Sequence, residues 1–201
     1  MNIIFDMDGT LWDSAENVAL AWNEAVGKSM FTERDIKSVM GMTMTSIAER
    51  LFPNETQEKR REFLVNCCEC ENKFLRERGG RLFPNTVGTL EKLFERGHKL
   101  FIVSNCQSGY IEAFLDYYKL GGLFTDKLCW GDNEHEKWEN IKLIMERNGL
   151  SEALYVGDTQ GDCDSAYKAE ARFAHAAYGF GEVNRCDHKI NDISELLDIV
   201  E

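Results

Sequence analysis

Hydrophobic positions in the second half of the chain alternate between two spacings. Short apolar runs typical of buried strands, such as "HKLFIVSN", follow segments with helical spacing, such as "TVGTLEKLFERG". The alternation continues through "LFTDKLCW", "ALYVGDT" and "RFAHAAYG" to the final "ISELLDIV". A strand–helix repeat of this kind predicts a parallel, doubly wound sheet with helices on its faces.

The first half of the chain has a different hydrophobic pattern. "NIIFD" (2–6) predicts one buried parallel strand, but from about Ser14 to Arg78 the spacing is helical and no strand is indicated. "TERDIKSVM" opens with a relative of the capping box, and a long amphipathic segment closes at Gly79 and Gly80. We therefore predict an α/β fold: a Rossmann-like core of residues 1–14 and 80–201, interrupted by a small all-helical domain, residues 15–79.

Composition narrows the class of protein. The 201 residues suffice for one good-sized core, and a net charge of −12 disfavours nucleic acid or an anionic membrane as the main partner. The seven cysteines are odd in number and the chain is not a small secreted scaffold, which favours reduced thiols. No apolar run is long enough to span a membrane. Asp6 ends the apolar run "NIIF" before it could serve as a signal sequence. We expect a cytoplasmic protein.

Polar residues follow the predicted strands at the edge where parallel sheets bind ligands. Each residue alone has an ordinary explanation, such as a surface turn, a helix cap or a solvated lysine. Their order, however, places all of them along one rim. These residues are Asp6 and Asp8 after the first strand, Ser104 and Asn105 after the second, Lys137 at the helix after the third, and Asp158 and Asp162 after the fourth.

The same residues carry a resemblance to a known family. "FDMDGT", "VSN", a lysine that opens a helix, and "VGDTQGD" resemble the four motifs of the haloacid dehalogenase superfamily of phosphotransferases. The resemblance spans nearly the whole chain, including a helical cap inserted after the first motif. It implies a Mg²⁺-dependent phosphatase that hydrolyses a small phosphorylated metabolite through an aspartyl-phosphate.

The resemblance also implies individual roles. Residues i and i+2 of an extended segment point the same way, so Asp6 and Asp8 face one ligand. Asp6 is expected to be the nucleophile and Asp8 the general acid and base. The expected metal ligands are Asp6, the backbone carbonyl of Asp8, and Asp158, with Asp162 in or next to the shell. The expected phosphate-binding residues are Gly9, Thr10, Ser104, Asn105 and Lys137.

The substrate is not indicated by these motifs. Relatives that act on sugar phosphates or phosphoglycolate often carry a basic residue after the glycine of this stretch, "GMTMTSIAER", where this chain has residues 42–45, "MTMT". Arg50 comes later, either as a solvated helix residue or as a substrate contact. This departure disfavours a second strongly anionic group on the substrate. We expect a small phosphate ester as the partner, with a monomer as the default state.

Three other functions share part of this pattern. A phosphomutase of the β-phosphoglucomutase type shares the fold and the phosphoenzyme. A signalling receiver also accepts phosphate on an aspartate, but it lacks a helical insert and the adjacent acidic pair at the first strand. A catalytically inactive binding module would not need all the motif residues, which are present.

Overall fold

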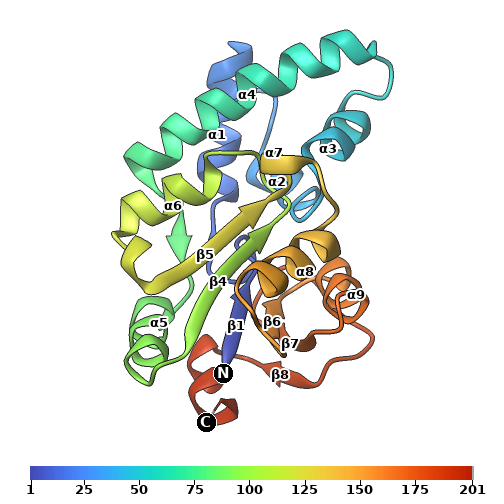
Figure 1. The fold of residues 1–201 in the computed structure, drawn as a ribbon. Coiled ribbons are helices and arrows are strands. Elements are labelled where there is room, and N and C mark those ends of the chain that lie inside the picture. Colours follow the sequence, from blue (N-terminus) through green and yellow to red (C-terminus); the bar gives the residue numbers. More distant parts are fainter. Residues whose placement is uncertain (201) are drawn as a thin grey trace.

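The computed structural model describes residues 1–200 and contains a parallel sheet of six strands in the order β5-β4-β1-β6-β7-β8 (Figure 1). All five neighbouring pairs run parallel. The predicted α/β class with a Rossmann-like core is confirmed. The strands are β1 (Asn2–Phe5), β4 (Lys99–Ser104), β5 (Phe124–Cys129), β6 (Leu154–Gly157), β7 (Arg172–Ala176) and β8 (His188–Ile190).

Strand β1 lies in the middle of the sheet, between β4 and β6. The chain adds β4 and β5 on one side of β1 and then returns to add β6, β7 and β8 on the other side. The order of the strands therefore reverses at β1, and the carboxyl ends of β1, β4 and β6 border one crevice.

Helices cover both faces of the sheet, and the central strand β1 is buried on both faces. Ile3 and Phe5 belong to one hydrophobic cluster and Ile4 to the other, as the two-residue period of a strand requires. The first cluster packs against α5 (Thr86–Glu95), α6 (Tyr110–Tyr118) and α10 (Leu196–Ile199), and the second against α8 (Lys137–Arg147) and α9 (Gln160–Lys168).

Four helices between β1 and α5 form a separate layer at the carboxyl end of the sheet (Figure 1). They are α1 (Ala15–Val26), α2 (Glu33–Lys37), α3 (Met44–Leu51) and α4 (Gln57–Arg78). Thr32 caps α2 in a capping box with Asp35, as the sequence predicts, and Gly79 follows α4 with a positive φ of 68°. Helix α1 packs along α4, and Trp22 of α1 and Cys67 and Phe74 of α4 are buried.

A two-stranded ribbon joins this helical layer to the sheet. Strand β2 (Trp12–Asp13) pairs antiparallel with β3 (Arg81–Leu82), so the chain enters and leaves the helices at the same place. Trp12 is fully buried and packs edge-on against Tyr110 and Phe114, so it belongs to the core.

The structure contains elements that the hydrophobic pattern does not indicate. These are the ribbon, the edge strand β8, a short helix α7 (Trp130–Asn133) and two 3₁₀ turns. Within residues 1–200, no helix combines the length and the apolar character needed to cross a membrane.

Candidate active site

Three carboxylates meet at the point where the strand order reverses. Asp6 follows β1, Asp158 follows β6, and Asp162 lies in the first turn of α9. One oxygen from each lies within 4.8 Å of the others, and all three side chains are buried. The structure therefore gathers these three predicted residues around one point.

Lys137 compensates much of this buried negative charge. It is the first residue of α8, and its Nζ lies 2.8 Å from Asp6 Oδ1 and 2.6 Å from Asp162 Oδ1. Burial alone would lower the pKa of Lys137, but the charges of Asp162 and Asp6 raise it well above its ordinary value. The lysine therefore keeps its positive charge at neutral pH.

The carboxylates have different protonation equilibria because only two of them contact the lysine. Burial raises the pKa of Asp6 to about 7, against the opposing effect of Lys137, and raises that of Asp158 to about 8 with the help of the charges on Asp162 and Asp6. Burial also acts to raise the pKa of Asp162, but Lys137 and hydrogen bonds from Thr159 lower it below its ordinary value. The cluster thus holds more negative charge than Lys137 neutralises.

This donor set fits a hard divalent cation. Asp158 Oδ2 accepts a hydrogen bond from the Phe180 amide at 2.8 Å, whereas its buried Oδ1 has no hydrogen-bond partner among the described residues. Carboxylate oxygens that lie this close without donors are the ligands that Mg²⁺ prefers. The oxygens of Asp162 are less available to a cation, because they accept hydrogen bonds from Lys137 and from Thr159.

Gly9 allows the loop after β1 to approach Asp158. It has a φ of 83°, and a Cβ atom built on it would lie 2.1 Å from Asp158 Oδ2. Glycine therefore meets two requirements here, a left-handed conformation and a close approach to a carboxylate.

Asp8 is turned away from the three-carboxylate cluster and lies on the helical layer's side of the loop. Ser14 Oγ donates to its Oδ1 at 2.6 Å, and the Tyr110 hydroxyl lies 2.8 Å from its Oδ2. Burial raises the pKa of Asp8 to about 6, although these two hydrogen bonds oppose the shift. A carboxyl with this pKa exists in both protonation states near neutral pH.

Two of the expected phosphate-binding residues, Ser104 and Asn105, line the same cavity as Asp6. Ser104 ends β4 and is buried, and the buried hydroxyl of Thr10 has no hydrogen-bond partner among the described residues. The Asn105 side chain donates to the backbone oxygen of Gly41 at 2.8 Å, so it links the end of β4 to the helical layer. The end of β4 therefore supplies polar groups to the cavity that Asp6 lines.

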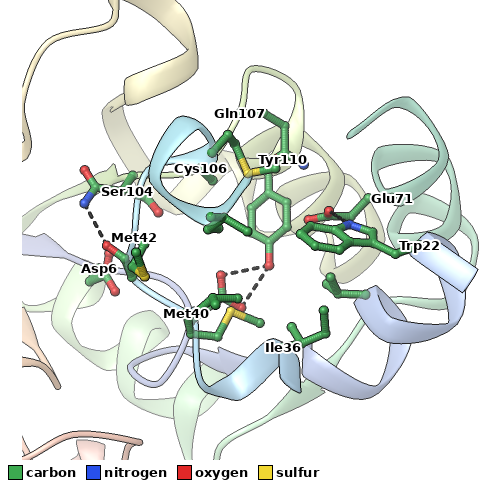
Figure 2. Close-up of a pocket in the computed structure, with 17 residues that line it drawn as sticks. Asp6, Trp22, Ile36, Met40, Met42, Glu71, Ser104, Cys106, Gln107 and Tyr110 are labelled. Carbon is green, nitrogen blue, oxygen red and sulfur yellow. Dashed lines mark hydrogen bonds between the residues drawn. The ribbon is translucent and has the colours of Figure 1, made fainter. Parts of the chain in front are cut away.

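A cavity of about 50 Å³ opens from Asp6 and Asp8 into the helical layer (Figure 2). Trp22 from α1 and Glu71 from α4 lie at its far end, and Met40, Met42 and Met44 also line it, with Met42 beside Asp6. The cavity thus lies between the acidic residues of the sheet and the helices.

Sequence reasoning missed several residues that build this site. Ser14 and Tyr110 hold Asp8, Thr159 caps α9 and holds Asp162, and Glu71 lines the cavity. Ser14 lies a few residues after the first motif, so its position in the sequence could have indicated a contact with Asp8. Tyr110 and Glu71 had none, because their positions depend on how α6 and α4 pack.

The fold and the site together define an α/β enzyme with a buried acidic cluster at the reversal point of its parallel sheet. The sequence profile of the haloacid dehalogenase-like hydrolases matches residues 3–176. The chain belongs to this family.

Similar proteins agree with this assignment. Phosphoglycolate phosphatase from Aquifex aeolicus is 28% identical over 90% of this chain and 87% of its own length, and that from Vibrio parahaemolyticus is 28% identical over 98% and 95%. A predicted phosphoglycolate phosphatase from Haemophilus somnus has a similar fold, with a TM-score of 0.86 at 24% identity over 99% of this chain and 97% of that one. The expected class, a phosphatase of this family, is confirmed.

Gly9→Ala tests the close approach to Asp158. We expect it to destabilise the protein by about 1–3 kcal/mol and to weaken Mg²⁺ binding, because the new Cβ displaces a carboxylate. Gly97→Ala is the matched control, since Gly97 has the same φ of 83° but no described atom lies within 4 Å of its Cβ position. Urea unfolding and Mg²⁺ titration measure both effects. Equal losses in the two variants would contradict the role of the Asp158 contact.

The raised pKa values predict how stability depends on pH without metal. Asp8, Asp6 and Asp158 have folded pKa values of about 6, 7 and 8, against an ordinary value of 3.8. Between these limits the folded protein binds more protons than the unfolded chain, so the free energy of unfolding falls as pH rises. We expect the melting temperature in a chelator to fall progressively from about pH 5 to pH 8.

Asp158→Asn isolates the contribution of the cluster to this pH dependence. The variant removes one raised carboxyl, so its melting temperature should fall less over the same range. Asp198→Asn, at an exposed position in α10, serves as the control and should follow the native protein. An unchanged slope in Asp158→Asn would show that the cluster does not produce the effect.

Proposed function

We propose that the protein is a Mg²⁺-dependent phosphatase that hydrolyses a small phosphomonoester through an aspartyl-phosphate on Asp6. The observation that carries this proposal is the meeting of Asp6, Asp158, Asp162 and Lys137 at one point, beside a cavity that extends from Asp6 toward the helical layer. Membership of a hydrolase family with phosphatase relatives supports the same reaction.

The proposed ligands of Mg²⁺ are Asp6, the backbone carbonyl of Asp8, and Asp158, with Asp162 in or next to the shell. When bound, Mg²⁺ would neutralise negative charge on the transferring phosphoryl group. Four carboxylates, one divalent ion and Lys137 leave a formal charge of about −1, and protonation of Asp8 removes it. An acidic protein can therefore accept a phosphate ester at this one place.

Asp6 is positioned to act as the nucleophile. Its hydrogen bond to Lys137 fixes one oxygen, and Lys137 favours the ionised carboxylate that must attack phosphorus. The attack forms a bond between an Asp6 oxygen and phosphorus while the ester oxygen departs. Water then hydrolyses the aspartyl-phosphate and restores the carboxylate.

Asp8 is proposed to move the proton in both steps. With a pKa of about 6 it can donate a proton to the departing alcohol oxygen and then accept one from the attacking water. Ser14 and Tyr110 hold its carboxyl on the side of the cavity, where the leaving group would lie. They are therefore positioning residues for Asp8.

The phosphoryl oxygens are assigned to Ser104, Asn105, Lys137, and the loop at Gly9 and Thr10. Ser104 and the unpartnered hydroxyl of Thr10 can donate to an anion, and Gly9 gives the loop its close approach. The amide group of Asn105 would have to exchange its contact with Gly41 for a phosphoryl oxygen.

Residues 15–79 are proposed to act as a cap over a core formed by residues 1–14 and 80–201. In this structure the helical layer contacts the core through the Asn105–Gly41 hydrogen bond and through an ion pair of 2.9 Å between Lys37 and Asp13. A cap closed in this way would exclude bulk water during the first step. We expect the enzyme to act in the cytoplasm on a freely diffusing ester.

A phosphomutase is the alternative within the same chemistry. It has to hold a second phosphate group on the cap side of the substrate. Among the described residues that line the cavity there is no lysine or arginine, and the charged ones are Asp6, Asp8 and Glu71. This lining favours hydrolysis. Conversion of a sugar 1-phosphate to a 6-phosphate, primed by a bisphosphate, would instead establish the mutase.

Asp6→Asn tests the covalent mechanism. We expect hydrolysis of p-nitrophenyl phosphate to fall at least about a thousandfold, because an amide cannot form the phosphoenzyme. Circular dichroism should show an intact fold, and the exposed Asp198→Asn should retain full activity. Chelation should abolish the native activity, and Mg²⁺ should restore it. If Asp6→Asn keeps a tenth of the native rate, the proposed nucleophile is wrong.

A further inference from the structure

The cavity combines an apolar wall with a third acidic residue at its far end. Glu71 is 4% exposed, although it lies in the middle of α4, where a charged side chain usually reaches solvent. Figure 2 shows Glu71 beside Trp22, on the side of Tyr110 away from Asp6. The apolar wall consists of Val18, Trp22, Ile36, Val39, Met40, Met42, Met44 and Ile47.

The hydrogen bonds of Glu71 are too few to compensate its charge. Trp22 Nε1 donates to Glu71 Oε2, and Gln107 is a second hydrogen-bond partner. No lysine, arginine or histidine among the described residues forms an ion pair with it. A buried carboxylate without a counter-ion is costly.

The protonation of Glu71 reflects this deficit. Burial raises its pKa to about 7, and the two hydrogen bonds oppose the shift without cancelling it. A bound cation would stabilise the ionised carboxylate at neutral pH. The site therefore favours a bound cation, and no described residue supplies one.

We propose that the substrate is the phosphomonoester of an amino alcohol, with its ammonium group bound by the Glu71 carboxylate and the Trp22 indole. This inference rests on the proposed function, because the phosphate must lie at Asp6 for the rest of the molecule to reach α4. The carboxylate supplies charge, the aromatic ring supplies a cation–π contact, and the methionines and aliphatic side chains pack against the connecting carbons.

An anionic group is disfavoured in the same position. A carboxylate such as that of phosphoglycolate would meet Glu71 in a cavity whose other charged lining residues are Asp6 and Asp8. Arg50 is exposed, and its guanidinium contacts Met42 Sδ at 3.7 Å rather than lining the cavity. The substrate named for the relatives is thus a poor match to this lining.

Matched pairs of esters test the charge preference on the native enzyme. Phosphate release with Mg²⁺ is measured for 2-aminoethyl and 3-aminopropyl phosphate, and for propyl and butyl phosphate, in which a methyl group replaces the ammonium. Phosphoglycolate is the anionic comparison. We expect kcat/KM for the better amino ester to exceed that of its alkyl partner at least about tenfold, as for hydrogen bonds to charged groups, and phosphoglycolate to be poorest.

Glu71→Gln tests which residue produces the preference. The amide keeps an oxygen acceptor for Trp22 but loses the charge, so the ratio of kcat/KM between amino and alkyl esters should fall about tenfold. A purely structural role would leave this ratio unchanged. Glu77→Gln, at an exposed position on the same helix, is the control and should keep the native ratio. Thermal unfolding checks that each variant is folded.

The outcomes separate this inference from the proposed function. Hydrolysis of the esters and of p-nitrophenyl phosphate without any preference for the amine would overturn the inference and leave the phosphatase proposal standing. A preference that survives in Glu71→Gln would overturn the role of Glu71. If no ester is hydrolysed with Mg²⁺, both proposals fail together.

Discussion

The ammonium group of Lys137 is the contact on which the site depends. It joins two carboxylates that belong to different parts of the chain, Asp6 after β1 and Asp162 in α9. Buried acids at this spacing repel one another and lose their hydration, so without a cation the strand ends could not approach. Lys137 compensates part of the negative charge. A divalent cation can compensate the rest, and a phosphate can then approach. The excess of buried carboxylate charge over the charge of Lys137 therefore governs both the stability of this region and its chemistry.

The position of β1 explains why these groups meet. Because β1 lies between β4 and β6, the segments that follow the three strands face one another across the crevice where the strand order reverses. The helical layer closes this crevice from above and contributes a wall of different chemistry. The sheet thus provides the acidic groups that react, and the helices provide the surface that a leaving group contacts.

The sequence predicted the core and all three carboxylates of the acidic cluster because both depend on local patterns. Apolar runs of strand length and the residues that directly follow them are visible without the structure, which is how Asp6, Ser104 and Asp158 were found. The strand β8 was missed because its three residues, "HKI", have little apolar character at the sheet edge. Tyr110 and Glu71 were missed for another reason. Their roles depend on the packing of α6 and α4 over the crevice, and helical periodicity does not specify which buried residue faces a cavity.

The ribbon of β2 and β3 has a mechanical consequence. Two separate tethers would let the helices tilt and twist independently of the sheet, but here Trp12 is paired with Leu82 and Asp13 with Arg81. Arg81 also donates to Asp13 at 2.7 Å, which ties the two tethers together at one end of the ribbon. Bending of one tether must carry the other with it. The ribbon therefore restrains the four helices from moving on two independent tethers.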